Sequence, residues 1–598
     1  MESKVLKKRE EIQEQDKWSI NEIYSNDEVW EKEYKELQEE APKLKEFEGK
    51  LGDGETLIRY FEVNEKVSRK AEKIYVYAHL RCDEDTSNKK YQAMMNKIDA
   101  YMAEYATYTA YVVPEILSLP DGTIEKQMEE LKGLEPYKFL LENILKEKPH
   151  VLDKKEEELL AAASDCLDAP SSIHNIMTNA DMKFGNIKDE DGEEVELTEG
   201  NYSSFIKSKD REVRKEAFKG LFKEYKAFEN TLATTLSSSI KVFNFGARVR
   251  NYNSALEASL KPNDIPLEVY TNAIKTIDDN LSSLHRYVGL KKKLLGLDEM
   301  HMYDLYVPVI EIPKERVEFD DAVKMAIEGL QPLGKEYLDI FQEGINGGWI
   351  DKYINKGKRG GAYSWGGYDT KPYVLLNYNY ELNDVSTLVH EMGHSIHSYY
   401  SRKEQSYYYA GYTLFCAEVA STTNEALLIH HLINKETDKK KKLYLINQEL
   451  EQIRTTVFRQ LMFAEFELYT HESFEKGIPL TAEDYNAKWH ELNVKYFGPE
   501  MVVDYEIDVE WSRIPHFYSD FYVYQYATGY AAASAFAKSI LNKEPNAVEK
   551  YVGFLKSGGS DYPIEILKKA GVDMTTPKPL EATIDRFNEL LDMLEKEI

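Results

Sequence analysis

The octapeptide His390–His397, HEMGHSIH, places His390 and His394 four residues apart, with Glu391 directly after the first. On an α-helix, residues with this spacing lie on one face, and their Cβ atoms are roughly 5–6 Å apart. The two imidazoles can therefore bind one zinc ion, at Zn–N distances of about 2.0–2.1 Å. Glu391 is rotated by about 100° around the helix. It is too far round to join that ligand pair, but it can reach a water on the metal and act as a general base.

The chain before the octapeptide predicts short strands that lead into this helix. Residues 358–380, KRGGAYSWGGYDTKPYVLLNYNY, are rich in glycine, aromatic residues and strand formers. Asn383 or Asp384 then offers an N-cap for a helix from about residue 385 to about residue 400. Within that helix, Gly393 would keep the surface thin where another segment packs closely.

A catalytic zinc ion needs a third protein ligand and one open position. The helical segment at 415–433, FCAEVASTTNEALLIHHLI, carries Glu418 and Glu425 seven residues apart, on one face. Either carboxylate can bind the metal while the other hydrogen-bonds to a ligand imidazole. His397 lies one turn beyond His394, where binding the same ion would stretch the coordination sphere. We expect His397 to pack or to support a ligand.

A second group of polar aromatic residues lies near the C-terminus, in residues 512–536, SRIPHFYSDFYVYQYATGYAAASAF. A tyrosine hydroxyl or an imidazole can donate a hydrogen bond to the oxyanion of a tetrahedral intermediate. However, the chain contains 43 tyrosines, and aromatic stripes usually pack cores. The residues alone therefore leave both interpretations open for this segment.

Length and patterning predict a large, mainly helical protein of more than one lobe. With 598 residues and a hydrophobic fraction of 42%, the chain is too long for one ordinary core. Most of it follows helical periodicity. We expect an N-terminal helical lobe at residues 1–200, with a β-hairpin near 182–197, and a catalytic domain at residues 201–598.

Charge and cysteine usage restrict the possible partners and location. A formal net charge of -29 argues against nucleic acid and against an anionic membrane as partners. The three cysteines lie far apart, so neither a disulfide framework nor a cysteine metal site is expected. The first twenty residues lack an apolar signal region, and no apolar run reaches about 18 residues. We expect a cytoplasmic protein.

With these motifs in view, the sequence resembles the oligoendopeptidase F group of the thimet oligopeptidase-like (M3) zinc metallopeptidases. The resemblance extends over almost the whole chain, and the blocks that carry it are far more specific than HExxH alone. These blocks include KWSINEIY, SKDREVRKEAF, ARVRNYNSALEASL, LHRYVGLKKKLLGLDEMHMYDLYVP, GGAYSWGGYDTKPYVLLNYNYELNDVSTLVHEMGHSIHSYY, AEVASTTNEALL and IPHFYSDFYVYQYATGYAAA.

The resemblance implies a role for each of the motif residues. It implies one zinc ion per chain, bound by His390, His394 and Glu418, with Glu391 as general base. It implies transition-state stabilisation by residues of the C-terminal block, namely His516, Tyr522 and Tyr526. Because the tyrosine register is ambiguous there, two further residues stay alternatives, Tyr518 and Tyr530.

The fold and activity that the resemblance implies are a two-lobed helical enzyme, with a deep channel, that hydrolyses internal bonds of short oligopeptides. One alternative is an exopeptidase of the same zinc class, which needs a cation to bind the free C-terminus of the peptide. Arg513 is close in sequence to His516 and is a candidate for that cation, although nothing in the sequence places it in the site. Another alternative is an inactive peptide-binding scaffold, although such a protein has no need of Glu391. Cobalt or manganese could replace zinc at such a site. The oligomeric state does not follow from the sequence.

Overall fold

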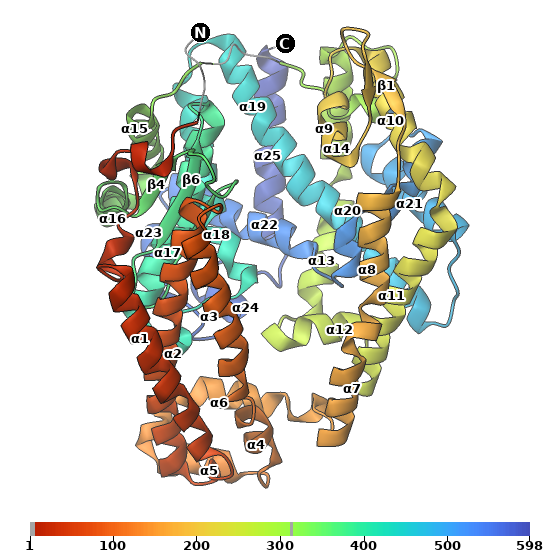
Figure 1. Cartoon of the computed structure of the whole chain (residues 1–598). Helices are drawn as coiled ribbons and strands as arrows, with labels where there is room; N and C mark the ends of the chain where they lie inside the picture. Colours follow the sequence, from red (N-terminus) through yellow and green to blue (C-terminus); the bar gives the residue numbers. More distant parts are fainter. Residues whose placement is uncertain (1–5, 311–314, 598) are drawn as a thin grey trace. The chain divides into compact units, whose positions relative to one another are not determined.

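The structure is a computed structural model that describes residues 6–310 and 315–597 (Figure 1). The predicted fold class is confirmed, because the chain is mainly α-helical and its sheets are small. None of the described helices combines the length and the apolar character needed to cross a membrane. The chain divides into two compact units, each built from segments distant in sequence. Unit 1 consists of residues 1–148, 314–431 and 536–571, and unit 2 of residues 149–313, 432–535 and 572–598.

Unit 1 contains the octapeptide. Its α-helices are α1 (Asp27–Glu40), α2 (Gly54–Glu84), α3 (Lys89–Thr107), α4 (Val112–Ser118), α5 (Thr123–Glu130), α6 (Lys138–Lys146), α15 (Phe319–Leu330), α16 (Gly334–Asn346), α17 (Leu382–Glu404), α18 (Leu414–Lys435), α23 (Ala547–Ser557) and α24 (Pro563–Lys569). The last four residues of α18 belong to unit 2, and α22 (Tyr524–Leu541) likewise begins in unit 2 and ends in unit 1.

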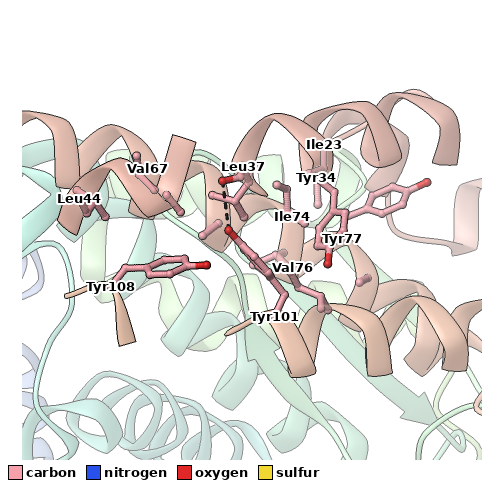
Figure 2. Packing of buried hydrophobic residues seen from close by; sticks show 14 of the residues in the cluster. Ile23, Tyr34, Leu37, Leu44, Val67, Ile74, Val76, Tyr77, Tyr101 and Tyr108 are labelled. Carbon is pink, nitrogen blue, oxygen red and sulfur yellow. Dashed lines mark hydrogen bonds between the residues drawn. The ribbon is translucent and has the colours of Figure 1, made fainter. Parts of the chain in front are cut away.

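The N-terminal part of unit 1 is a helical layer held by aromatic packing. Figure 2 shows the buried side chains between α1, α2 and α3. Tyr34 packs edge-on against Tyr101, with ring centroids 5.5 Å apart. The hydroxyl of Tyr101 donates a hydrogen bond of 3.2 Å to the carbonyl oxygen of Leu37. The apolar ring is thus buried while its polar atom keeps a partner, as buried tyrosines require.

A three-stranded sheet lies beside α17, at the place where the sequence predicts one. Its central strand is β6 (Tyr373–Tyr378), which pairs in parallel with β4 (Ile350–Tyr353) and antiparallel with β5 (Tyr363–Trp365). The first four residues of β6 are buried, which suits a strand covered on both faces. The side-chain hydroxyls of Ser364 on β5 and Ser395 on α17 are 2.7 Å apart. The sheet therefore supports the helix that carries the octapeptide.

Unit 2 is also helical. Its α-helices are α7 (Lys154–Leu167), α8 (Ala169–Ile176), α9 (Glu199–Phe205), α10 (Arg211–Ala227), α11 (Glu229–Val249), α12 (Ala255–Leu260), α13 (Leu267–Asp278), α14 (Leu281–Leu294), α19 (Lys439–Ile453), α20 (Arg459–Glu475), α21 (Ala482–Phe497) and α25 (Lys578–Glu597). Its strands are β1 (Asn186–Lys188), β2 (Glu194–Glu196), β3 (Met300–His301) and β7 (Met501–Val502).

Strands β1 and β2 form an antiparallel hairpin in the segment where the sequence predicts one. Strands β3 and β7 pair in parallel although about 200 residues separate them. A π-helical turn at Arg454–Phe458 joins α19 to α20. The expected division into lobes at residues 200 and 201 follows the order of the chain, whereas the two units combine distant segments. That boundary stays a prediction.

Candidate metal centre

Helix α17 begins earlier than the sequence analysis predicts. Its N-cap is Glu381, and Asp384 lies at the third helical position. The Asp384 carboxylate accepts hydrogen bonds from the backbone N–H groups of Asn379, at 2.8 Å, and Glu381, at 2.9 Å. The prediction of Asn383 or Asp384 as N-cap is therefore wrong. The helix runs to Glu404, one turn beyond the predicted end.

Three side chains on α17 and α18 form a triangle of donor atoms. The Nε2 atoms of His390 and His394 are 3.2 Å apart. The Oε2 atom of Glu418 lies 3.4 Å from the first and 3.5 Å from the second. Among the residues that the structure describes, this is the one group of three or more His, Cys, Asp or Glu side chains that could hold a metal ion.

The dimensions of this donor triangle fit a tetrahedral metal ion. Two ligand atoms about 2.0–2.1 Å from a tetrahedral zinc ion are about 3.3–3.4 Å apart. The three edges of the triangle, 3.2, 3.4 and 3.5 Å, lie within about 0.1 Å of that range. Two imidazoles and one carboxylate are also a ligand set that catalytic zinc sites use, with the fourth position left open. The residues present therefore fit the metal that the sequence predicts.

Glu425 supports the triangle from behind. Its Oε2 atom is 3.4 Å from Nδ1 of His390, the ring nitrogen that faces away from the triangle. Its Oε1 atom accepts a hydrogen bond of 3.1 Å from the hydroxyl of Ser386. Such a carboxylate fixes the orientation and tautomer of a ligand imidazole. Of the two assignments left open by the sequence, the geometry favours Glu418 as metal donor and Glu425 as the carboxylate that supports His390.

The electrostatics of the site favour a cation. Burial lowers the pKa of His390, but the Glu425, Glu391 and Glu418 carboxylates outweigh it and raise that pKa to about 9. The hydrogen bond from His394, together with the charges of both histidines, lowers the pKa of Glu418 to about 2 in spite of burial. The carboxylates around His390 thus favour a positive charge at this position, and a divalent ion bound there would supply one.

Glu391 is more deeply buried than the two histidines of the donor triangle. Its side chain is buried, and burial raises the pKa of its carboxyl group, although His390 and His394 act in the opposite direction. A carboxylate with a raised pKa accepts a proton more readily than an ordinary glutamate does, as a general base must. Its chemistry fits the predicted general base.

Gly393 lets the two helices of the site come into backbone contact. A Cβ atom at this position would lie 2.7 Å from Cα of Ser421 and 3.0 Å from the carbonyl oxygen of Ala420, both on α18. The expectation that Gly393 keeps α17 thin is confirmed. The Asn424 side chain then donates a hydrogen bond of 2.9 Å to the carbonyl oxygen of Val389 and fixes α18 against α17.

His397 has a packing role. Its ring stacks on Tyr412 with centroids 3.7 Å apart and an interplanar angle of 6°. It also lies near Phe554 of α23, at 5.2 Å. Burial lowers the pKa of His397 to about 3, so the ring is neutral at physiological pH. The sequence expectation that His397 packs or supports a ligand agrees with this position.

The predicted residues of the C-terminal block come together within unit 2. The ring of His516 lies 6.2 Å from Tyr522 and 6.0 Å from Tyr526, and the two tyrosine rings are 5.4 Å apart. All three side chains are partly exposed. Tyr518 points elsewhere, since its hydroxyl is 2.7 Å from Thr235 Oγ1.

Two residues that the sequence analysis missed hold the loop between His516 and Tyr522. Phe521 has a positive φ of 58°, which is strained for a bulky side chain. Its backbone N–H donates a hydrogen bond of 2.7 Å to Glu467 of α20. Glu467 is buried, and burial raises its pKa. A glutamate on the apolar face of 461–471 is the only sequence feature that could have indicated this anchor.

Comparison with known proteins decides the family. The profile described as Peptidase family M3 matches residues 204–586, and the profile described as Oligopeptidase F matches residues 115–184. The chain belongs to peptidase family M3. This M3 chain is 49% identical to Oligopeptidase PepF of Bacillus subtilis (strain 168), in an alignment that covers 99% of this chain and 88% of that protein.

Solved structures agree with the M3 assignment. A peptidase structure from Chlamydophila abortus has a TM-score of 0.95 and 38% sequence identity, with 99% of this chain and all of that chain covered. Oligoendopeptidase-F from Enterococcus faecium has a TM-score of 0.73 and 40% identity, with 96% and 99% covered. The family resemblance drawn from the sequence is therefore confirmed, and the M3 chain is a peptidase.

Proposed function

We propose that this M3 peptidase is a zinc-dependent endopeptidase that hydrolyses internal peptide bonds of short oligopeptides. The observation that carries the metal dependence is the donor triangle, whose edges of 3.2, 3.4 and 3.5 Å fit one tetrahedral ion. The names of the relatives, an oligopeptidase and an oligoendopeptidase, support the substrate class. The metal ligands that we propose are His390, His394 and Glu418.

The site residues in unit 1 have different tasks in this proposal. His390, His394 and Glu418 would hold a zinc ion, which would supply Lewis acidity for the scissile carbonyl group and the attacking water. Glu391 takes a proton from that water and later gives it to the leaving amine. Glu425 keeps the imidazole of His390 oriented, so that its Nε2 atom faces the ion.

The residues of the C-terminal block are proposed as hydrogen-bond donors to the oxyanion. His516 and one tyrosine, Tyr522 or Tyr526, would each contribute about 10²–10³-fold to the rate. Burial lowers the pKa of His516, and a neutral imidazole still carries one N–H donor. The family resemblance supports these roles. Tyr518 is the weaker alternative, because its hydroxyl is engaged by Thr235.

The position of Arg513 weighs against the exopeptidase alternative. An exopeptidase that releases C-terminal residues needs a cation to bind the free carboxylate. The Arg513 guanidinium already forms an ion pair with Glu199, with Nη2 and Oε2 2.6 Å apart and a second contact of 3.3 Å from Nε. Its charge is thus neutralised within unit 2. We therefore favour cleavage inside the peptide.

The general base is tested by Glu391→Gln, with Glu404→Gln at the end of the same helix as the matched control. We expect Glu391→Gln to retain stoichiometric zinc and to lose nearly all turnover of a quenched-fluorescence peptide. The control should keep both zinc and turnover. Substantial activity in Glu391→Gln would exclude this residue as the base, and a protein that hydrolyses peptides equally well without any metal would refute the zinc proposal.

The position of cleavage is tested by product mapping. A mixed pool of short peptides is digested in two forms, with free and with amidated C-termini, and the products are identified by mass spectrometry. An endopeptidase should cut both forms at the same internal bonds and at similar rates. Sequential release of C-terminal residues that amidation abolishes would favour the exopeptidase.

A further inference from the structure

Unit 2 contains a cavity of about 580 Å³ that takes no part in the proposed hydrolysis. It lies between helices α9, α10, α14, α19 and α20. Such a volume is in the range that holds small organic ligands. Several of the residues that line it are aromatic: Tyr202, Phe218, Tyr306 and Tyr444.

Positive charge predominates in this cavity, although the whole chain has a formal net charge of -29. Five of the lining residues are Lys or Arg, whereas two are Glu. Arg459 is neutralised by Glu510, with Nη2 and Oε1 2.7 Å apart. Arg513 is neutralised by Glu199, as described above. The excess of positive charge therefore comes from the other three cations, Lys207, Lys291 and Arg454.

The buried part of this excess is a trio with two cations and one carboxylate. Glu451 accepts a contact of 2.7 Å from Nζ of Lys291 and one of 2.6 Å from Nη2 of Arg454. The side chains of both cations are 1% exposed. Burial lowers the pKa of Lys291, and repulsion by Arg454 adds to this effect. One carboxylate cannot balance both groups when both are charged, so the charged trio is one counter-charge short, and this shortage disfavours the charged form of Lys291.

Arg454 also has a donor without an acceptor. Its Nε and Nη2 atoms both bond to Glu451, but its buried Nη1 atom has no hydrogen-bond partner in the described structure. An unpaired buried donor is costly, and a native structure that keeps one requires an explanation. Arg454 is moreover the first residue of the π-helical turn, a local irregularity that often occurs at functional sites.

We propose that this cavity binds a small organic anion that bears a carboxylate or phosphate group, with Arg454 as the principal ligand-binding residue. The anion supplies the missing counter-charge and the missing acceptor for Nη1. Arginine binds both oxyanions strongly because its planar N–H groups match their geometry. The aromatic side chains contact the body of the ligand. This site goes beyond the proposed peptidase activity and does not depend on it.

The binding test is isothermal titration of the zinc-loaded protein with benzoate, phenyl phosphate and inorganic phosphate, at constant ionic strength. Benzamide is the neutral, shape-matched control ligand. We expect an aromatic anion to bind at least about tenfold more tightly than benzamide, as one charge-assisted hydrogen bond implies. Tighter binding of phenyl phosphate would assign the phosphate class, and tighter binding of benzoate the carboxylate class. Anions that bind no better than benzamide would overturn the proposal.

Variants separate this cavity from the metal centre, where an anion could also bind. Arg454→Gln should weaken binding of the preferred anion by about ten- to a hundredfold. Ser203 is an exposed residue of the cavity lining, and Ser203→Trp should block the cavity without removing a charge. This variant tests the site even if Arg454→Gln does not fold. The matched control is Lys241→Met. Lys241 lines a separate cavity of about 250 Å³ in the same unit, so this variant should bind the anion like the wild type. Unchanged binding in both test variants would refute the site.

Discussion

Replacing Gly393 by alanine tests whether the metal centre depends on the close approach of α17 and α18. The new Cβ atom would lie 2.7 Å from Cα of Ser421, about 0.7 Å inside ordinary van der Waals contact. The neighbouring atoms belong to the backbone, so no side-chain rotation can relieve the clash, and the helices must separate. A shift of that size, carried to the donors, would take the distances from Glu418 to both histidines from 3.4 and 3.5 Å to about 4 Å.

The expected effects on stability and on metal binding differ. Overpacking destabilises by about 1–3 kcal/mol, whereas glycine to alanine in a helix interior gains about 1 kcal/mol. We therefore expect Gly393→Ala to lose only about 0–2 kcal/mol of unfolding free energy. Zinc binding should suffer more, because donors about 4 Å apart no longer fit Zn–N distances of about 2.0–2.1 Å. A loss of at least about tenfold in zinc affinity is expected, which corresponds to 1.4 kcal/mol.

The assay is zinc competition against a fluorescent chelator, together with urea unfolding of the metal-free protein. Gly553→Ala is the matched control, since it lies inside helix α23 and a Cβ atom there would meet nothing within 4 Å. The control should keep wild-type zinc affinity and unfold no more easily than the wild type. The reasoning fails if Gly393→Ala binds zinc as tightly as the control does.

Three further predictions concern the surroundings of the two sites. Glu425→Gln should lower zinc affinity by about 10–100-fold through the loss of its contact with His390, and a zinc titration at wild-type affinity would contradict this. Because the folded-state pKa of His397 is lowered to about 3, its stabilising contribution is complete above about pH 6.5 and is lost at about 1.4 kcal/mol per pH unit as the pH falls below that value. His397→Phe should therefore flatten the decline of urea-unfolding free energy between pH 6.5 and 4.5, and an equal decline in both proteins would count against it. Glu467→Leu should release the strained turn at Phe521 and lower kcat more than KM, while Glu467→Gln, which keeps the acceptor, should restore most of kcat; if both variants lose activity equally, the hydrogen bond is not what matters.

The elements that carry the candidate metal centre could be predicted from the sequence because their constraints are local. A spacing of four residues on one helix brings His390 and His394 together whatever the rest of the chain does. The glycine- and aromatic-rich segment before them became strands β5 and β6. The N-cap was predicted wrongly because Asp384 is a residue type that often caps helices. In the structure it lies at the third helical position, and its carboxylate accepts a hydrogen bond from the backbone N–H of the N-cap residue, Glu381. Capping rules weigh residue type, and they do not tell which of several adjacent polar residues begins the helix.

Features that depend on distant segments could not be predicted in the same way. The interleaved composition of the two units joins segments hundreds of residues apart, and no periodicity encodes that. The pairing of Glu467 with the backbone of Phe521 spans 54 residues. Likewise Lys291 and Glu451, 160 residues apart, look like ordinary helix-surface charges in the sequence. Buried polar partners are recognisable only when both ends are seen together.

The compact placement of the metal donors along the chain has a consequence for biosynthesis. All three donors and Glu425 lie within α17 and α18, which are consecutive helices joined by residues 405–413. Bringing such neighbours together requires closing only a short loop, which carries a small entropic penalty and favours rapid formation. Helix α23, which packs on α17 through Phe554 and His397, is synthesised more than a hundred residues later. A nascent chain thus contains the whole proposed ligand set before α23 has left the ribosome, and a zinc ion bound during translation would hold α17 and α18 together in the interval.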